Sequence, residues 1–228
     1  MKSKVSAIIL SAGKGKRFED PLPKQFHLLK GKPIFEWSLE TFSDHELVDS
    51  IVLVIDNPPQ WKELKEKYSK IDKIVKGGER RQDSVKNGLK AIEEECIVLI
   101  HDAVRPLVSR ELITRVIEGV KNYGSAIPVI EETDSLKLVE DDKVLSTIRR
   151  EKVFRVQTPQ GFHLKDILYS HKIGEERGIF VTDDSELMEK AGFEVRTVKG
   201  EETNLKITTK LDLILAEAIL ENKGRYRF

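Results

Sequence analysis

The sequence contains very little cysteine. Cys96 is the only one among 228 residues, so no disulfide can form within the chain. A chain of this length buries a sizeable core without covalent cross-links, and a reducing compartment suits it. We therefore expect a cytoplasmic protein, with Cys96 as a buried strand residue.

The sequence also lacks an excess of charge of either sign. Its 39 Lys and Arg residues balance 39 Asp and Glu residues. Nucleic-acid-binding domains usually carry a basic excess, so the composition argues against a nucleic acid partner. Long apolar runs are missing too, since none approaches the roughly 20 residues that span a bilayer. The apolar residues 5–10 lead straight into a Gly-rich segment, which argues against a signal peptide.

Short apolar runs alternate with helix-like stretches along much of the chain. The runs at 5–10, 51–55 and 97–100 are typical of strands buried on both faces of a parallel sheet. Apolar spacing predicts amphipathic helices within 81–95, 112–120 and 210–222. To the buried face of the last helix we assign Leu211, Ile214, Leu215, Ala218 and Ile219. The alternation predicts an α/β three-layer sandwich around a Rossmann-like, mostly parallel sheet.

Residues 134–157 break this alternation. Leu136 and Leu138 alternate with polar residues, a polar cluster follows at 140–143, and a second apolar run covers 144–148. This pattern predicts a β-hairpin. An isolated hairpin is marginally stable in water, so we expect it to pack on something, most naturally a second copy of the chain. The interpretation is a single domain over residues 1–228 with a protruding β-arm at 134–157.

Ligands of such sheets bind beyond the carboxyl ends of the strands, so the segments that follow the strands are the candidate site. They cover residues 11–24, 77–84 and 101–106, all rich in glycine, charge or both. In the first, Gly13 and Gly15 allow backbone amides to approach phosphate oxygens. Positive charge comes from Lys14, Lys16, Arg17 and Lys24.

The Gly-rich segment is neither of two common nucleotide-binding motifs. Walker A needs Ser or Thr after its Gly-Lys pair, and neither pair here has one. The dinucleotide fingerprint needs a third glycine where Phe18 stands, which argues against a Rossmann dehydrogenase. The long, basic segment suits a triphosphate better. For this segment taken alone, a solvated loop with incidental charges stays an alternative.

Several motifs occur in order between residues 10 and 209. They read L-S-A-G-K-G-K-R-F at 10–18, P-K-Q-F at 23–26, G-G-E-R-R-Q-D-S-V at 77–85, H-D-A-V-R-P at 101–106, T-P-Q at 158–160, T-D at 182–183 and N-L-K-I-T-T at 204–209. Together they resemble the sugar-phosphate nucleotidyltransferases, and most closely the 2-C-methyl-D-erythritol 4-phosphate cytidylyltransferase family of the non-mevalonate isoprenoid pathway. Ser11 and Phe18 stand where that family has Ala and Met.

The resemblance implies transfer of CMP from CTP to a polyol phosphate, with release of pyrophosphate. Arg17 and Lys24 would contact the triphosphate and stabilise the transition state, while Lys14 and Lys16 would help less specifically or be solvated. The resemblance also places Ala12, Gly13 and Gly15 against the nucleotide, Gly78, Glu79 and Ser84 around the cytosine, and Asp102 near the ribose and the metal-bound phosphates.

On the acceptor side, the resemblance implies that Arg150 and Lys206 hold and aim the acceptor phosphate. Arg105 would anchor its own loop or the second substrate. The polyol would be lined by Ser135, Thr158, Thr182 and Asp183. Arg149 adjoins Arg150, so that assignment could shift by one, although the spacing to Thr158 favours Arg150. Asp183 with Glu186 also matches a helix-capping pair, and His101 has the alternative of purely local hydrogen bonds.

In the resembled family the arm reaches across a dimer, so each site would borrow Ser135 and Arg150 from its neighbour. We therefore expect a homodimer with arm exchange. Mg²⁺, or another divalent cation, suits phosphate oxygens. It is expected mainly on the CTP phosphates, with Asp102 nearby and no protein ligand assigned.

Two other functions stay open from the sequence. A ribitol-5-phosphate or other pentitol-phosphate cytidylyltransferase would share the H-D-A-V-R-P and T-P-Q motifs, although D-S-L-K at 134–137 and R-E-K-V-F at 150–154 favour the methylerythritol enzymes. A non-catalytic nucleotide-binding regulator would be expected to have lost an essential cation. Here Arg17, Lys24, Arg150 and Lys206 are all present.

Overall fold

A mixed, mostly parallel β-sheet forms the centre of the molecule, in a computed structural model that describes residues 3–13, 18, 20–56 and 61–222. Its strands are β1 (Val5–Ser11), β4 (Ser50–Ile55), β5 (Ile71–Val75), β6 (Ile97–Asp102), β7 (Ser125–Glu131), β10 (Phe154–Val156), β11 (Gln160–His163) and β12 (Thr197–Lys199). They lie in the order β10-β7-β11-β6-β1-β4-β5, with β12 beside β7. Strand β1 is parallel to β4 and β6, whereas β11 is antiparallel to β6 and β7. The strands predicted from the apolar runs are confirmed.

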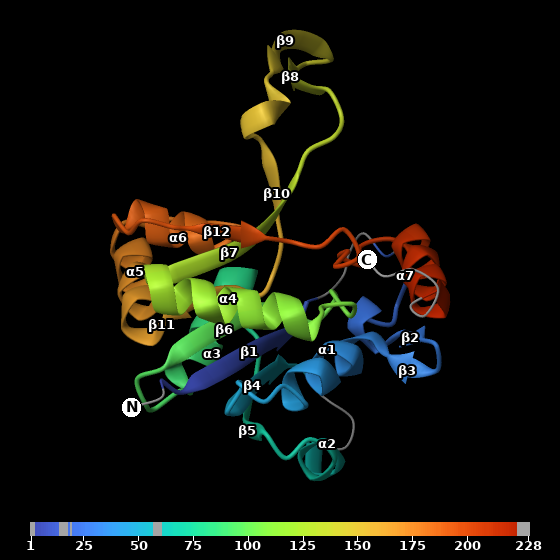
Figure 1. Cartoon of the computed structure of the whole chain (residues 1–228), viewed down its shortest axis with the longest axis vertical. Helices are drawn as coiled ribbons and strands as arrows, with labels where there is room; N and C mark the ends of the chain where they lie inside the picture. Colours follow the sequence, from blue (N-terminus) through green and yellow to red (C-terminus); the bar gives the residue numbers. More distant parts are fainter. Residues whose placement is uncertain (1–2, 14–17, 19, 57–60, 223–228) are drawn as a thin grey trace.

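Helices cover both faces of the sheet (Figure 1). They are α1 (Ile34–Ser43), α2 (Trp61–Lys67), α3 (Arg81–Lys90), α4 (Arg110–Tyr123), α5 (Leu164–Glu176), α6 (Asp184–Lys190) and α7 (Lys210–Asn222). Shorter pieces are the 3-10 helices η2 (Lys24–Phe26) and η3 (Arg150–Lys152), and the strand pair β2 (Leu28–Leu29) and β3 (Lys32–Pro33). None of the described helices combines the length and the apolar run needed to cross a membrane.

Successive residues of the central strands enter different cores. In β1, Val5, Ala7 and Ile9 join the cluster that holds the apolar faces of α1 and α4, whereas Ile8 joins the one that holds α3 and α5. All four side chains are at most 2% exposed. Because both faces of the strand are covered, its sequence is continuously apolar rather than alternating. The predicted three-layer α/β sandwich is confirmed.

Helix α3 ends before residue 95, where the apolar spacing predicted its end. The amides of Ala91 and Ile92 bond back to Gly88 and Leu89, which tightens the last turn and stops the helix. Glu93, Glu94 and Glu95 follow directly. Carboxylates in the last turn of a helix are unfavourable, because that end of the helix carries a partial negative charge. Ending α3 before these three residues avoids this repulsion.

Cys96 lies just before β6 and is buried, 6% exposed. Burial raises the pKa of its thiol to about 11. The thiol is therefore protonated at neutral pH and poorly nucleophilic. The prediction of a buried Cys96 is confirmed, with the residue at the edge of the strand rather than inside it.

The buried face predicted for helix α7 is wrong at Leu211, Ile214, Leu215 and Ala218, and confirmed only at Ile219. Leu211, Ile214 and Leu215 are 63%, 61% and 48% exposed. The helix instead contacts the cluster around Leu29 and Ile34 through Ala216, with the partly buried Leu213, Ile219 and Leu220 beside it. Apolar residues surround most of this helix, so periodicity alone could not select the face that packs.

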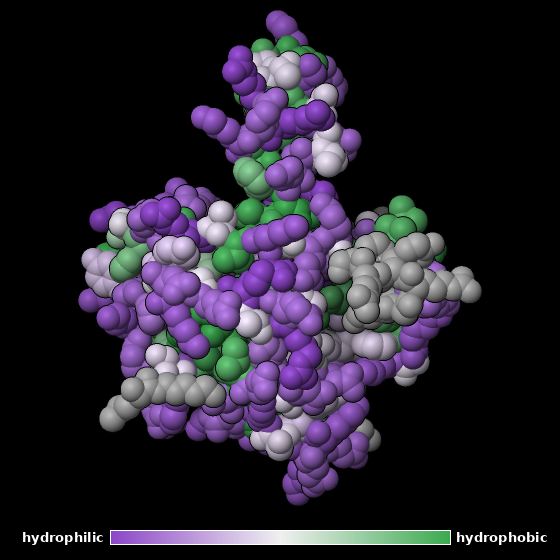
Figure 2. All heavy atoms as spheres, in the orientation of Figure 1, coloured by the Kyte–Doolittle hydropathy of each residue, from purple (hydrophilic) through white to green (hydrophobic). Residues whose placement is uncertain are grey.

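The predicted hairpin is confirmed as strands β8 (Leu136–Glu140) and β9 (Lys143–Ile148), which pair with each other and project from the body (Figure 1). Its turn residues Asp141 and Asp142 have φ values of 46° and 61°, the left-handed conformation that tight hairpins need. Figure 2 shows apolar surface on this arm, which carries the exposed residues Leu138, Val139, Val144, Leu145 and Ile148. The arm predicted over 134–157 is shorter at its end, because β10 (154–156) pairs with β7 in the central sheet.

Gly119 permits the close packing of α4 on β7. A methyl group on Gly119 would lie 2.6 Å from Cβ of Ala126 and 3.0 Å from Cγ1 of Val198. A Cβ atom cannot rotate away, so the helix itself would have to shift. We expect Gly119→Ala to lower the free energy of unfolding by about 1–3 kcal/mol, measured by urea denaturation. Glu118→Ala, an exposed neighbour on α4, should change it by less than about 0.5 kcal/mol; equal stability of the two variants would contradict the packing argument.

Candidate active site

A cavity of about 270 Å³ opens beyond the carboxyl ends of β1 and β6. Among the residues that line it are Ala12, Gly13, Lys24, Arg81, Ser84, Asp102 and Lys206. They come from segments far apart in the sequence: the ends of β1 and β6, the helix η2, the start of α3 and the segment before α7. The sheet topology therefore gathers cations, one carboxylate and a Gly-containing backbone at the edge where α/β sheets bind ligands.

A larger cavity, of about 750 Å³, adjoins Ala12, Gly13 and Gln25 as well. Its wall is mainly apolar, with Leu22, Phe26, Phe35 and Leu64. Its charged residues are three carboxylates and one lysine: Glu36, Asp56, Glu63 and Lys67, with Lys67 paired to Glu36. Since phosphate chemistry requires placed cations, the smaller cavity is the candidate active site.

The loops after β1 and β5 approach each other very closely. A methyl group on Gly77 would lie 2.2 Å from Cβ of Ala12, so only glycine fits there. The Gly77 amide donates to Oδ1 of Asp56 at 3.1 Å, and the Gly78 amide donates to Oγ of Ser84 at 3.0 Å. The Ser84 hydroxyl in turn donates to the carbonyl of Arg80 at 3.1 Å. These bonds fix the loop at the start of α3 against the Gly-rich segment.

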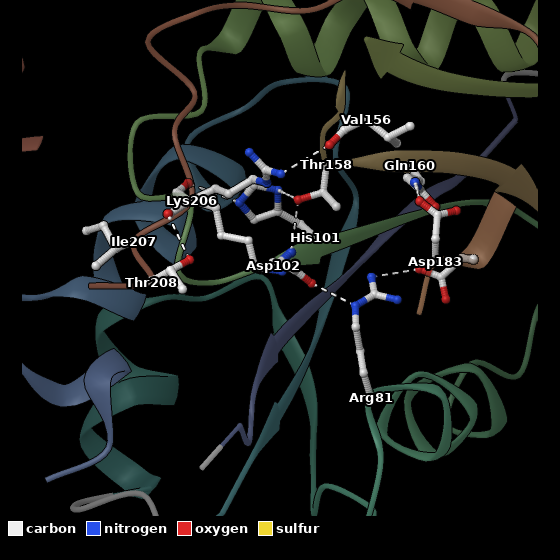
Figure 3. Close-up of polar contacts among 12 residues, drawn as sticks. Arg81, His101, Asp102, Val156, Thr158, Gln160, Asp183, Lys206, Ile207 and Thr208 are labelled. Carbon is white, nitrogen blue, oxygen red and sulfur yellow. Dashed lines mark hydrogen bonds and ion pairs between the residues drawn. The ribbon is translucent and has the colours of Figure 1, made fainter. Parts of the chain in front are cut away.

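Four charged side chains form a continuous chain of ion pairs beside the cavity. Arg81 donates through Nη2 to Oδ2 of Asp184 at 2.8 Å and through Nε to Oδ1 of Asp102 at 3.0 Å. Lys206 donates through Nζ to Oδ2 of Asp102 at 2.6 Å. Figure 3 shows Arg81 and Asp102 facing each other. Both oxygens of Asp102 are thus engaged by cations.

These cations keep Asp102 ionised. Its burial disfavours the charged form, yet the charges of Arg81 and Lys206 outweigh burial and hold the pKa of Asp102 far below its usual range. Burial likewise lowers the pKa of Arg81, but Asp184 and Asp102 together raise it above its usual value. Asp102 is therefore an anion, and Arg81 a cation, throughout the physiological range.

Thr158 and His101 fix the backbone under Asp102. Oγ1 of Thr158 accepts from the Asp102 amide at 3.1 Å and lies 3.1 Å from Nδ1 of His101. Burial lowers the pKa of His101 to about 3, so its ring is neutral at physiological pH. Its Nε2 lies 3.2 Å from the carbonyl of Arg105, which can only accept, so Nε2 carries the proton and Nδ1 accepts from Thr158. His101 therefore has one local partner, Arg105, as the alternative expected, but its bond to Thr158 is made across 57 residues of the chain.

Arg105 anchors the loop after β6. Its guanidinium donates to the carbonyls of Asn204 at 2.8 Å and Val156 at 3.3 Å. Asn204 is itself fully buried and donates through Nδ2 to the carbonyl of Thr158 at 2.9 Å. This set of bonds connects the loop after β6 with the segment that carries Lys206.

Lys24 contacts the same segment that carries Lys206. Its Nζ donates to the carbonyl of Ile207 at 2.9 Å, next to Lys206 in the chain. Lys24 and Lys206 both line the cavity. Two ammonium groups therefore converge on the space beside the Gly-rich backbone, which is an arrangement suited to phosphate groups.

Asp183 caps helix α6, as its spacing to Glu186 predicted. Its Oδ1 accepts from the amides of Ser185 at 2.7 Å and Glu186 at 3.2 Å. Gln160 donates through Nε2 to Oδ2 of Asp183 at 2.8 Å. Thr182 precedes it and is exposed. The segment is thereby fixed next to the cavity, with Asp184 in contact with Arg81.

The predicted site residues fall into different places. The cavity is lined by Ala12, Gly13, Lys24, Ser84, Asp102 and Lys206, whereas Gly78, Thr158, Arg105 and Asp183 hold the surrounding backbone. Glu79, Thr182, Ser135 and Arg150 are not among the residues that line this cavity. Ser135 and Arg150 belong to the projecting arm, where Arg150 donates to the carbonyl of Thr133. Gly15 and Arg17, with Lys14 and Lys16, lie outside the described residues.

The side chains around the cavity suit a metal ion that binds together with a substrate phosphate. Within the part of the chain that the structure describes, no group of three or more His, Cys, Asp or Glu side chains could hold a metal ion. Asp102 is the carboxylate that lines the cavity, and both its oxygens already accept from cations. Mg²⁺ commonly binds through few carboxylates and substrate phosphates, so this arrangement fits an ion carried on a polyphosphate.

Sequence reasoning did not assign a role to Arg81. It stands as the second of two adjacent arginines at the start of α3, and spacing alone cannot tell which one turns inward. Arg80 is half exposed and pairs with Asp83, while Arg81 is 26% exposed and bridges two carboxylates. In the resembled family the motif at 77–85 reads G-G-x-x-R-x-x-S-V, with its arginine at position 81, and this was the available signal.

Comparisons with known proteins agree over nearly the whole chain. The family model for 2-C-methyl-D-erythritol 4-phosphate cytidylyltransferase matches residues 5–222. The protein of that name from Clostridium botulinum (strain 657 / Type Ba4) is 45% identical, over 96% of this chain and 98% of its own. The one from Syntrophus aciditrophicus (strain SB) is 40% identical, over 98% of each chain. The crystal structure of 4-diphosphocytidyl-2C-methyl-D-erythritol synthase from Anaerococcus prevotii DSM 20548 is similar with a TM-score of 0.84, 35% identity, and coverage of 97% and 100%.

The charge of Asp102 predicts a pH-dependent contribution to stability. Its pKa is depressed in the folded state, so the contribution is complete above the unfolded pKa of about 4 and is lost as pH falls below that value. We expect Asp102→Asn to lower the free energy of unfolding by roughly 3 kcal/mol at pH 7, and by clearly less at about pH 3. Urea denaturation at both pH values measures this. Asp141→Asn, at the exposed hairpin turn, should show no such difference; a deficit of Asp102→Asn that is equal at both pH values would contradict the account.

Proposed function

This chain belongs to the 2-C-methyl-D-erythritol 4-phosphate cytidylyltransferase family, and from that membership we propose how its side chains divide the reaction. It transfers CMP from CTP to 2-C-methyl-D-erythritol 4-phosphate, giving 4-diphosphocytidyl-2-C-methyl-D-erythritol and pyrophosphate, in the non-mevalonate route to isoprenoid precursors. The match to this family favours the methylerythritol acceptor over the pentitol phosphates. One observation carries the division of roles: Lys24, Lys206 and the Gly13 backbone line a single cavity.

The nucleophile is an oxygen of the acceptor phosphate, which attacks the α-phosphorus of CTP while the bond to pyrophosphate breaks. A phosphate monoester has its second pKa near 6, so this oxygen is already largely ionised at neutral pH. No general base is needed. The site has to bring two anions together and stabilise the charge that builds up in the transition state, which requires positioned cations and amides.

We assign Lys24 and the backbone around Gly13 to the triphosphate, together with Arg17. Lys24 is held by the carbonyl of Ile207, so its ammonium group is positioned before the substrate binds. Preorganised cations stabilise a transition state more effectively than groups that must reorient. Asp102, at the same edge, would lie near the ribose.

The loop at Gly78, Glu79 and Ser84 is assigned to the cytosine. The Ser84 hydroxyl uses its proton on the carbonyl of Arg80 and one lone pair on the Gly78 amide. A hydroxyl has two acceptor sites, so one remains. That remaining lone pair suits a donor such as the exocyclic amine of cytosine, and uracil presents a carbonyl at the same place.

Lys206 is assigned to the acceptor phosphate, with Arg150 from a second copy of the chain. Ser135 and Arg150 lie on the arm, whose β8 and β9 residues are mostly exposed. A lone hairpin with five exposed large apolar residues is stabilised by packing on another molecule. The apolar arm needs a covering surface, and Arg150 and Ser135 need a cavity to act on. A homodimer that exchanges arms would provide both, because each arm would pack on the partner and bring these two residues to the partner's cavity.

Mg²⁺ completes the proposal, held on CTP phosphate oxygens near Asp102, where it would neutralise charge on the leaving pyrophosphate. A cytoplasmic location is likewise proposed, since the substrates are charged metabolites and the only cysteine is a buried thiol.

Removal of the Lys24 ammonium group should slow chemistry strongly. We expect Lys24→Ala to lower kcat for pyrophosphate release, with CTP, Mg²⁺ and methylerythritol phosphate, by about a hundredfold, because one transition-state cation is lost. Lys90→Ala, an exposed lysine at the end of α3, serves as the control and should retain wild-type turnover. Turnover within twofold of wild type in both variants would remove Lys24 from the mechanism.

Arm exchange predicts complementation between two inactive variants. Arg150→Ala and Lys206→Ala chains, co-expressed with different affinity tags and purified through both, should form mixed dimers. Each mixed dimer would contain one site with an intact Lys206 and an intact incoming Arg150, so activity should reach about half that of the wild-type dimer. If the arm served its own chain instead, every site would lack one cation and the mixed dimers would stay inactive.

A further inference from the structure

Arg81 connects two parts of the site that belong to different substrates. Its side chain lies between Asp102, at the nucleotide edge, and Asp184, the first residue of α6 after the segment assigned to the acceptor. Arg81 itself begins α3, the helix whose preceding loop is assigned to the cytosine. A single guanidinium therefore spans α3, β6 and α6.

Neighbouring bonds show that this region is built around α3. Gln82 accepts from the amide of Val181 at 3.1 Å and donates to the carbonyl of Ile179 at 3.2 Å. The segment 179–184 is thus fixed to the start of α3 by two consecutive residues, Arg81 and Gln82. Movement of either would displace Thr182 and Asp183.

The two ends of the ion-pair chain have the lowest and the highest exposure of its four side chains. The side chain of Asp184 is 2% exposed, Asp102 10%, Arg81 26% and Lys206 37%. The buried end at Asp184 serves as an anchor, and the open end is the ammonium group that faces the cavity. Lys206 has three N–H donors, of which Asp102 Oδ2 takes one, so the ammonium group can bind a phosphate without leaving Asp102.

Without Arg81, Asp102 would compete with the acceptor phosphate for Lys206. The four side chains carry two positive and two negative charges, and loss of Arg81 would leave one net negative charge beside the phosphates. Arg81 donates to Oδ1 of Asp102 and neutralises part of its negative charge. Lys206 is then less strongly neutralised by Asp102 and can interact more strongly with the substrate. Arg105 adds a further positive field at Asp102, but its two hydrogen bonds are to the carbonyls of Asn204 and Val156.

We infer that Arg81 is a positioning residue for the transfer reaction: anchored by Asp184, it orients Asp102 so that Lys206 presents its ammonium group to the acceptor phosphate. The inference rests on the proposed assignment of Lys206. A direct role is the alternative, in which Arg81 itself contacts a phosphate from its place on the cavity wall. The two roles predict opposite effects when Asp184 is removed.

Steady-state kinetics of Arg81→Gln and Asp184→Ala distinguish them. If Arg81 positions Asp102, both variants should lower kcat/KM for the acceptor by about tenfold or more, since small displacements of a catalytic group are costly. The affinity for CTP, measured by calorimetry, should change by less than about threefold. Asp184→Asn, which keeps an acceptor oxygen for Arg81, should recover much of the loss. Arg177→Gln, at an exposed arginine just after α5, is the matched control, and both its acceptor kcat/KM and its affinity for CTP should stay within twofold of wild type.

If Arg81 binds phosphate directly, releasing it from Asp184 should instead preserve or improve activity. A normal acceptor kcat/KM in Asp184→Ala, together with a lowered one in Arg81→Gln, would therefore overturn the inference. Unchanged acceptor kinetics in Arg81→Gln would overturn it as well. Arg81→Lys, whose compact ammonium group cannot bridge both carboxylates, should stay impaired and replaces Arg81→Gln if thermal unfolding shows that the latter does not fold. Lys206→Ala tests the underlying assignment separately: if it is inactive while Arg81→Gln is normal, the proposed function stands and only the positioning role is lost.

Discussion

Burying a charged carboxylate at the end of a sheet costs free energy unless cations pair with it. Asp102 is ionised because both Arg81 and Lys206 form ion pairs with it. This requirement determines much of the surrounding architecture. The loop after β5 has to bring α3 to the sheet edge, the chain has to return after β12 to place Lys206, and Thr158 with His101 has to fix the backbone of β6 beneath. Gly77 allows the first of these approaches, because any larger residue would collide with Ala12.

The sequence was most informative where one local rule determines one structure. Strands β1, β4 and β6 are continuous apolar runs, and the cap at Asp183 follows from its spacing to Glu186. It was less informative where a choice depends on tertiary contacts. Helix α7 is apolar on more than one side, so the contact with Leu29 and Ile34 selects its buried face. The same holds for Arg80 and Arg81, because the carboxylates that separate their roles lie 21 and 103 residues away from Arg81 in the chain.

The proposed division of the site between body and arm follows from charge. The body supplies two ammonium groups within one cavity, and it holds both in place before any substrate is present, through Ile207 for Lys24 and Asp102 for Lys206. Arg150 lies outside this arrangement, on an element with almost no core of its own. A further cation held permanently beside Lys24, Arg81 and Lys206 would raise the electrostatic cost of folding. In the proposed dimer, a cation that belongs to a neighbouring chain would reach the cavity only when the subunits assemble.

The thiol of Cys96 has a practical consequence. It is the only cysteine in the chain, it is buried, and its pKa of about 11 keeps it protonated at neutral pH. Maleimide and nitroxide reagents react with thiolates, so the native protein offers them almost no target. A cysteine introduced at the hairpin turn, in place of Asp141 or Asp142, would therefore be labelled selectively without first removing a native thiol. Spin labels or fluorophores there would report whether the arms of two chains come together in solution, and at what distance.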